Sequence, residues 1–569
     1  MIGVSLGRAR ALRRCLLVLG VVLLVLQSTG VRAGVPPVPE RSGITPPSLT
    51  SLPEASAQAT KPDSRRKNGA DLIENGKVHI RRLDLRGKVL YPQYGVTPQV
   101  ISDWVEQVFA SQDPWLSVAE MHRLADSLTG LYRDKGLTFA QVYVVPQEIV
   151  EGRLELNVLV GVLAEVDVHG NDLYSKEQLL APFRELVGKE LYEPDVVRAI
   201  ESLNRRPGLR VFGIFSMGDQ YGETRLNLRI QEEDRQDTLV RADNFGVDET
   251  GQYRLMVQHV RNNLFGDGGA LQATLVQTSE RGNLFGGLSY HHPLGLRHSL
   301  TASFARSQYE VGGDFAELGL AGILEAGTLA WGYHLERTAT HSLTIGLSGA
   351  AKRSRIESDE FQSLLEQQVQ YATLVPSVEF SRLHQAYRLH QQGAVRLLLG
   401  AVTSGGEELE KSVFGALELD YRVQYAWPFA SLEQLLVADF RALYSPDPLP
   451  SAERRSLTGG QAVRGYEAGL FSADKGYQLS VSQVLASWSG DAGWSARPFL
   501  FVDHGFGQLN DAQGNWARFT AAGLGIEAAW AESVRVGLTW GQPLGQATGR
   551  NLDLEAGPAR VYGHLSYRF

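Results

Sequence analysis

The sequence of 569 residues contains a single cysteine, Cys15, which lies in an apolar segment near its start. Disulfide bonds therefore cannot hold the remainder of the chain together. After this segment, no run of residues is both apolar enough and long enough for a membrane-spanning helix, which needs roughly 20 residues. The formal net charge is −8 at pH 7, and this mild acidity argues against nucleic acid as a partner.

Patterns typical of catalysis and of metal or nucleotide binding are also missing. The glycine cluster "GDGG" at 266–269 is not flanked by a strand and a helix that could cradle phosphate. His291 and His292 have no third ligand at metal spacing. After the N-terminal segment, no G-x-S-x-G stretch or carboxylate pair predicts a hydrolase. The charged stretches "RRPG" and "AERRS" (452–456) are interpreted as solvated loop charges. We therefore expect no catalytic residue, metal site or cofactor.

The N-terminal segment has the pattern of an export signal. Four arginines precede an apolar run from Cys15 to Leu26, and small residues follow with a cleavage site at Ala33. A retained membrane anchor is the less favoured alternative. Residues 34–75 are rich in Pro, Ser, Thr and charge, and we interpret them as a flexible linker. An exported chain without helical spans is either a soluble multidomain protein or a membrane β-barrel.

Residues 76–161 and 162–234 each read as a small α+β domain with the order β-α-α-β-β. In the first, we expect strands at 78–87, 138–145 and 153–160, and helices at 98–110 and 117–136. In the second, we expect strands at 163–171, 209–217 and 224–232, and helices at 175–188 and 193–208. Two successive units of similar length indicate an internal repeat, with a chance coincidence of pattern as the alternative.

Residues 235–569 lose helical periodicity and show alternating segments of about ten residues separated by turn residues. The 333 residues from Asp237 to Phe569 would give 16 strands at roughly 21 residues per strand and connector. The predicted fold is a transmembrane antiparallel β-barrel of about 16 strands, preceded by the two α+β domains. A soluble all-β domain is the competing interpretation. The last strand alternates as a lipid-facing strand would and ends on aromatic Phe569.

Four blocks of sequence carry a resemblance to a known family. The stretch "LYRDKGLTFAQVYVVPQEIVEGRLELNVLVG" (131–161) is similar to the end of the first POTRA domain of two-partner secretion transporters. Residues 241–271 resemble the first hairpin of their barrel, and "QAVRGYEAG" (461–469) resembles the signature of their sixth loop. "PFLFVDHGFG" (498–507) is similar to their F-x-D-x-G strand motif. The chain is identified as a member of this haemolysin/filamentous-haemagglutinin secretion-activation family within the POTRA–β-barrel superfamily.

The resemblance implies specific site residues. The sixth loop, containing 459–469, would fold into the barrel between the eleventh and twelfth strands, and Arg464 would pair with Asp503 on the inner wall. The implied loop motif is Val463, Arg464, Gly465 and Tyr466, and the barrel-wall motif is Phe501, Asp503 and Gly505. Tyr567 and Phe569 resemble the terminal assembly signal of bacterial outer-membrane barrels. The expected substrate-docking strand is Thr138, Phe139, Ala140, Gln141, Val142, Tyr143, Val144 and Val145, whose edge would add an extended polypeptide by β-augmentation.

Two departures from the family are visible. Prolines interrupt the N-terminal region where relatives place a pore-plugging helix, which puts such a plug in doubt. Ser482 and Gln483 stand where many relatives place an acidic residue after the sixth loop. A second charged partner for Arg464 is therefore not expected there.

The function implied by the resemblance is transport across the bacterial outer membrane. The POTRA domains, in the periplasm, would receive an unfolded partner exoprotein, and the barrel would pass it to the cell surface. The other expected partners are outer-membrane lipid and the barrel-assembly machinery, without nucleic acid or nucleotide. The alternatives are an insertase of the same superfamily that assembles other barrels, and a barrel enzyme such as a lipase or protease.

Overall fold

The computed structural model describes residues 73–74, 76–111, 113–279, 282–295, 297–338, 340–358, 367–405, 412–429, 432–490, 493–511, 513–531, 533–545, 548–550 and 557–569. The predicted signal (1–33), nearly all of the linker (34–75) and the region of the doubtful plug lie outside these residues. Over the described ranges the chain forms two compact units, one ending at Glu233 and the other beginning at Asp234. No helix within these ranges is long and apolar enough to cross a membrane. The predicted domain boundaries remain predictions.

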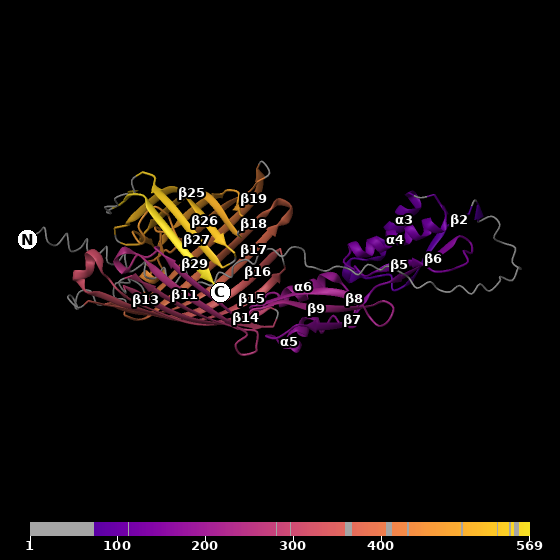
Figure 1. Ribbon diagram of the computed structural model, residues 1–569, viewed down its shortest axis with the longest axis horizontal. Coiled ribbons are helices and arrows are strands. Elements are labelled where there is room, and N and C mark those ends of the chain that lie inside the picture. Colours follow the sequence, from indigo (N-terminus) through magenta and orange to yellow (C-terminus); the bar gives the residue numbers. More distant parts are fainter. Residues whose placement is uncertain are drawn as a thin grey trace, which may run out of the picture. The chain divides into compact units, whose positions relative to one another are not determined.

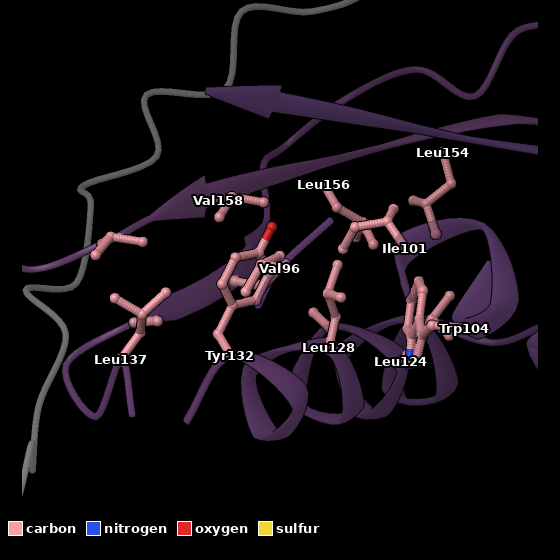
Figure 2. Packing of buried hydrophobic residues seen from close by; sticks show 14 of the residues in the cluster. Val96, Ile101, Trp104, Leu124, Leu128, Tyr132, Leu137, Leu154, Leu156 and Val158 are labelled. Carbon is pink, nitrogen blue, oxygen red and sulfur yellow. The ribbon is translucent and has the colours of Figure 1, made fainter. Parts of the chain in front are cut away.

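The first α+β domain packs two helices against a three-stranded sheet. The sheet order is β3-β6-β5, with β3 parallel and β5 antiparallel to β6. Figure 2 shows Leu124, Leu128 and Tyr132 pointing from α4 toward the strand that carries Leu154, Leu156 and Val158. Full burial of such a side chain contributes about 1.5–3 kcal/mol. The elements are β1 (Ile73–Glu74), β2 (Lys77–His79), β3 (Arg82–Gly87), η2 (Pro92–Tyr94), α3 (Pro98–Ser111), β4 (Trp115–Leu116), α4 (Val118–Asp134), β5 (Gln141–Val144) and β6 (Arg153–Leu159).

Both helices of this domain begin at side-chain caps. The Thr97 hydroxyl accepts a hydrogen bond from the backbone N of Val100 at 3.4 Å, and Pro98 occupies the first helical position. At the start of α4, the backbone N and the hydroxyl of Ser117 each donate to Glu120 at 2.7 Å. This capping box lowers the pKa of the Glu120 carboxyl to about 2. The amphipathic pattern and the caps therefore locate these helices.

The predicted strand 78–87 is wrong as a single strand. The structure divides it into β2, which pairs with β1 and β4, and β3, which pairs with β6. Between them, the backbone N of Ile80 donates to Pro114 O and that of Arg81 donates to Gly152 O, both at 2.8 Å. The chain thus passes from one sheet to another at these two residues.

The second α+β domain repeats the architecture of the first. Its sheet order is β7-β9-β8, again with one parallel and one antiparallel pair, as the repeat predicted. The predicted helix 175–188 is wrong in length, because α5 stops at Leu180 and a 3-10 turn follows. Pro182 lacks the backbone N–H that continued helix would need. The elements are β7 (Val162–His169), α5 (Lys176–Leu180), η3 (Ala181–Phe183), α6 (Glu193–Leu203), β8 (Leu209–Met217) and β9 (Glu223–Glu233).

The predicted docking strand 138–145 is shorter in the structure. Only Gln141–Val144 form strand β5, and Thr138–Ala140 form a turn in which Ala140 N donates to Leu137 O at 2.8 Å. This turn joins the two domains: the Phe139 ring lies 4.7 Å from that of Phe215, and Thr138 bonds Glu193. Alternation of residue types cannot distinguish such a turn from a strand end. Thr138 and Phe139 are therefore part of the contact between the repeats.

A closed antiparallel barrel of sixteen long strands follows, as predicted (Figure 1). The last strand pairs with the first, from Leu239 opposite Arg568 to Asp243 opposite His564. The long strands are β10 (Gln236–Asp243), β11 (Arg254–Asn262), β12 (Ala270–Thr278), β13 (Asn283–Leu294), β14 (His298–Glu310), β15 (Leu320–Arg337), β16 (His341–Ser358), β17 (Gln367–His384), β18 (Leu389–Gly405), β19 (Val413–Phe429), β20 (Leu432–Tyr444), β23 (Lys475–Val484), β25 (Trp494–Gln508), β26 (Trp516–Trp530), β27 (Val534–Pro543) and β29 (Arg560–Arg568). Short β24 (Trp488–Ser489) and β28 (Thr548–Gly549) extend the sheet, and β21 (Arg455–Ser456) pairs with β22 (Ser472–Ala473) in the loop after β20.

The two faces of the barrel differ in chemistry. The outer face carries exposed apolar side chains that the strand registers place on one side. They include Leu288, Phe304, Leu329, Leu374, Leu397, Leu417, Leu524, Leu538 and Leu565. An apolar outer band is typical of strands that meet lipid. The inner face carries most of the charged residues discussed below.

Candidate functional site

The candidate site is the loop at 445–474, between β20 and β23. These are the eleventh and twelfth long strands of the barrel, so the loop lies where the sequence resemblance placed it. Its tip is buried against the inner wall: Val463, Tyr466 and Phe471 pack with Ala517 and Phe519 of β26. The loop therefore runs inside the barrel and is held there partly by apolar packing.

Arg464 and Asp503 are brought together by this arrangement. Nε and Nη2 of Arg464 donate to the two carboxylate oxygens of Asp503, each at 2.7 Å, and the backbone N of Arg464 adds a third bond at 3.0 Å. The Asp503 side chain is 1% exposed and that of Arg464 is 15% exposed. A forked guanidinium–carboxylate pair of this kind is strong and directional.

The remaining surroundings of the guanidinium are aromatic and hydroxylic. Its central carbon lies 3.5 Å from the centre of the Phe501 ring, a cation–π contact. Nη2 also donates to the hydroxyls of Ser480 at 3.0 Å and Ser482 at 3.5 Å. Gln483, by contrast, donates to Gln434 rather than to Arg464. Asp503 is thus the carboxylate partner, and neutral serines complete the site.

Glycines allow the loop to lie directly on the wall. A Cβ on Gly541 of β27 would stand 2.8 Å from the backbone N of Gly465, which has φ 95°. A Cβ on Gly505 of β25 would stand 2.8 Å from Val463 Cγ2. Both separations are shorter than carbon atoms tolerate without a shift of the chain. The sequence motif's glycines are therefore explained by close approach of loop and strand.

Two tyrosines fasten the residues that follow Arg464. The Tyr466 hydroxyl donates to Thr520 O at 2.9 Å. The Tyr562 hydroxyl donates to Tyr466 O at 2.6 Å and accepts from Gly465 N at 3.2 Å. Tyr562 and Gly541 were missed by sequence reasoning. Tyr562 lies on the inner face of β29, and only the folded loop provides its partner.

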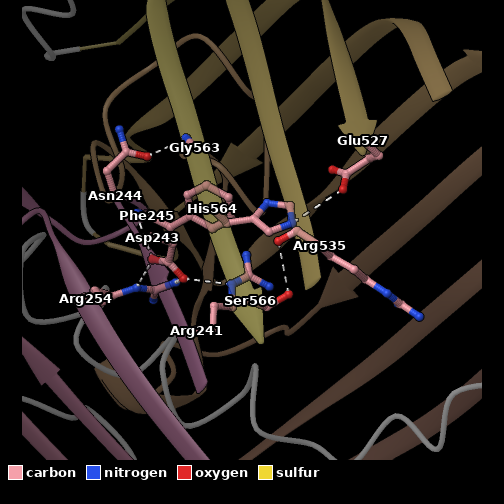
Figure 3. Close-up of polar contacts among 10 residues, drawn as sticks. All are labelled: Arg241, Asp243, Asn244, Phe245, Arg254, Glu527, Arg535, Gly563, His564 and Ser566. Atoms are coloured by element: carbon pink, nitrogen blue, oxygen red, sulfur yellow. Dashed lines mark hydrogen bonds and ion pairs between the residues drawn. The ribbon is translucent and has the colours of Figure 1, made fainter. Parts of the chain in front are cut away.

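The carboxyl-terminal residues close the barrel. Phe569 N and O both pair with Thr238 of β10, at 3.0 and 2.9 Å, while the side chains of Tyr567 and Phe569 are exposed and stacked 5.6 Å apart. Figure 3 shows Asn244 bonded to Gly563 across the same seam, and Asp243 held between Arg241 and Arg254. Side chains thus supplement the backbone ladder where the first and last strands of the barrel meet.

The first-domain edge strand is only partly open. β5 pairs with β6 alone among the described strands. However, Val142 N donates to the Thr129 hydroxyl at 2.9 Å, so α4 covers the outer edge at that position. Among the described residues, no group of three or more His, Cys, Asp or Glu is arranged to hold a metal ion.

These features define a class: outer-membrane β-barrel transporters with N-terminal POTRA domains. The family described as haemolysin secretion/activation protein ShlB/FhaC/HecB matches residues 222–528, and the POTRA domain of ShlB type matches 100–161. The chain belongs to this family. It is a two-partner secretion transporter of the outer membrane that exports a partner exoprotein, and it is not an enzyme.

Individual relatives agree with this assignment. The chain is 22% identical over 455 residues to the heme/hemopexin transporter protein HuxB of Haemophilus influenzae strain 86-028NP, covering 75% of this chain and 78% of the relative. It is 28% identical over 386 residues to the hemolysin transporter protein ShlB of Serratia marcescens, covering 64% and 66%. CdiB from Escherichia coli has a similar fold, with a TM-score of 0.67 at 18% identity over 93% of this chain and 94% of that chain.

The family assignment also decides among the alternatives. BamA from Haemophilus ducreyi, lacking POTRA domains 1–3, matches with a TM-score of 0.50 at 12% identity, over 86% of this chain and 100% of that chain. This likeness shows a shared fold and no more. The family match over residues 222–528 favours the transporter over the insertase and the barrel enzyme.

Proposed function

We propose that the α+β domains receive the exoprotein in an unfolded state and that it crosses the membrane through the barrel interior. The observation that carries this proposal is a loop pinned inside a sixteen-stranded barrel by a buried Arg464–Asp503 pair. A barrel of this size has room for an aqueous channel. Relatives named as transporters of hemolysin and of heme/hemopexin support a secreted protein as the cargo.

Docking is proposed at the free part of the β5 edge. Because Val142 N is taken by Thr129 and the Val145 carbonyl by Gln147, the available part of the edge is Tyr143–Val144. An extended segment of cargo would add there as a further strand. The apolar outer face would meet outer-membrane lipid, and neither nucleotide nor nucleic acid takes part.

Deleting residues 78–161 tests the docking proposal. The barrel does not need these residues to close, so it should still insert and remain heat-modifiable on gels, while secreted partner disappears from the medium. Normal secretion by the deletion variant would exclude the first domain as receptor. It would direct attention to β8, the nine-residue strand that pairs with β9 alone among the described strands.

The terminal residues Tyr567 and Phe569 are proposed as the signal read by the barrel-assembly machinery. Their exposed aromatic side chains lie on the outer side of the closing strand, where another protein can contact them. Deleting Phe569 should lower the amount of heat-modifiable barrel without lowering synthesis. Unchanged amounts of assembled barrel would contradict this role.

A further inference from the structure

Residues 449–456 form the first part of the loop, which we call the arm. Three consecutive charged residues of the arm each have a separate partner. Their stretch, "AERRS" at 452–456, was interpreted from sequence as solvated loop charge, and that interpretation is wrong. Glu453 bonds residues on β16 and β17, Arg454 bonds Asp474 at 3.0 Å, and Arg455 bonds Asp420 of β19 at 3.2 Å. Charges that are merely solvated would not all be paired, two of them with strands of the wall and one with the far end of the loop.

Glu453 is the most deeply buried of the three, with a side chain 7% exposed. Its Oε1 accepts from Lys352 Nζ at 2.6 Å and from the Tyr371 hydroxyl at 2.8 Å. Lys352 and Tyr371 stand directly opposite each other on the neighbouring strands β16 and β17. Loop residues Leu449 and Ala452 pack beside them in the same apolar cluster as Tyr371. The wall therefore offers a preformed site for one carboxylate of the loop.

Arg455 extends this attachment along the wall. Its guanidinium lies 3.2 Å from Asp420 and 3.7 Å from Glu418, both on β19. Arg396 of β18 bonds the same Asp420 at 2.7 Å. Glu453 and Arg455 thus present opposite charges, two residues apart, to wall sites of matching opposite charge.

The two attachments of the loop lie far apart around the barrel. β17, which carries Tyr371, is the eighth long strand, and β29, which carries Tyr562, is the sixteenth. In a closed barrel of sixteen strands these positions are half a circumference apart. A loop fastened at both spans half of the barrel interior, with further attachments between them at Asp420 of β19 and Asp503 of β25.

We propose that Glu453, assisted by Arg455, is a positioning residue that holds the loop across the barrel and keeps the pore closed at rest. This second anchor lacks the forked carboxylate pair and the close cation–π contact of the Arg464 anchor, so it releases first and lets the arm swing aside while the tip stays attached. The proposal rests on the proposed passage of cargo through the barrel interior.

Single-channel conductance of the full-length protein in planar bilayers tests the anchor without cargo. Glu453→Gln keeps the size of the side chain but removes its charge, and Glu453→Ala removes both. Open events should become at least about tenfold more frequent in Glu453→Ala, since about 1.4 kcal/mol of lost attachment gives that factor. Glu527→Gln is the matched control: Glu527 of β26 pairs with His564 of β29 at 3.4 Å on the inner wall, outside the charge network that holds Glu453 and Arg455. It removes one inner carboxylate yet should leave gating unchanged.

A charge swap separates positioning from general damage. Glu453→Lys alone should open the channel, and Lys352→Glu combined with Glu453→Lys should restore closure in a barrel that stays heat-modifiable. Wild-type gating in Glu453→Ala, or equal gating changes in the Glu527→Gln control, would overturn the proposal. If a single variant does not fold, the double variant Lys352→Glu with Glu453→Lys still tests the proposal. A double variant that folds but does not restore channel closure would also contradict the anchor.

Secretion of the partner is measured in the same strains. Altered gating with partner export still dependent on residues 78–161 supports both the anchor and the transport route. If the Glu453 variants gate normally and export the partner normally, only the proposed anchor is contradicted. If gating changes but every loop variant exports the partner normally, the proposed passage of cargo through the barrel is contradicted. The role of Glu453 as an anchor is then still supported.

Discussion

The inner loop is attached to the barrel wall at its tip, through Arg464, and at its arm, through Glu453 and Arg455. The two attachments differ in the kind of interactions that form them. At the tip, Arg464 makes a forked pair with a fully buried Asp503, stacks on Phe501 and is followed by residues that touch backbone at Gly541. At the arm, Glu453 makes two hydrogen bonds through one oxygen, and Arg455 makes looser ion pairs. The comparison indicates a fixed tip and a releasable arm.

The difference also has a chemical basis. The tip is held by close packing, which depends on glycines because a larger side chain would overlap the neighbouring backbone. Water cannot replace the packing contacts that are lost when the tip leaves the wall. The arm adds charge pairs to the packing of Leu449 and Ala452, and water that enters an opened barrel can solvate the released charges. Charge pairs are therefore the suitable attachment for the arm, which is the part of the loop that must move.

Breaking the tip should give the largest effect. Arg464→Ala or Asp503→Ala leaves the other charge unpaired in a buried site, which typically costs about 3–5 kcal/mol. Secretion should fall by more than about tenfold, because about 1.4 kcal/mol already gives that factor in occupancy of the seated loop. The double variant should be no worse than either single one, since both remove one coupled interaction. Strictly additive secretion defects would show that the two residues act separately.

Filling the contact beneath the tip should give a smaller effect. Gly541→Ala places a Cβ 2.8 Å from Gly465 N, and overpacking of this kind typically costs about 1–3 kcal/mol. Secretion should fall less than in Arg464→Ala, and the barrel should remain heat-modifiable. Gly327→Ala is the matched control, because a Cβ there meets nothing within 4 Å. Equal secretion by the two variants would argue against close seating of the tip.

The tip could be anticipated from sequence, whereas the arm could not. Arg464 and Asp503 stand in motifs whose resemblance to a family implied their contact on the inner wall. Glu453 stands among other charges in a long loop, where solvation is the ordinary outcome. Its partners Lys352 and Tyr371 lie 101 and 82 residues away in sequence, so only the register of β16 and β17 brings them together.

The α+β domains show the same limit on a smaller scale. Helix caps such as Ser117 act within four residues, and sequence locates them well. The turn at Thr138–Ala140 is set by the neighbouring repeat, through Phe139 and Phe215. An alternating pattern cannot reveal that contact, and the strand was therefore predicted too long.

Hydrogen exchange of backbone amides in the loop tests the central comparison most directly. It is measured on the full-length protein in detergent, by peptides that separate residues 449–456 from 457–471. We expect slow exchange over 457–471, where Arg464 N and Gly465 N donate to Asp503 and Tyr562, and faster exchange over 449–456. Exchange that is equally slow in both segments, or slower in the arm than in the tip, would contradict a fixed tip and a releasable arm.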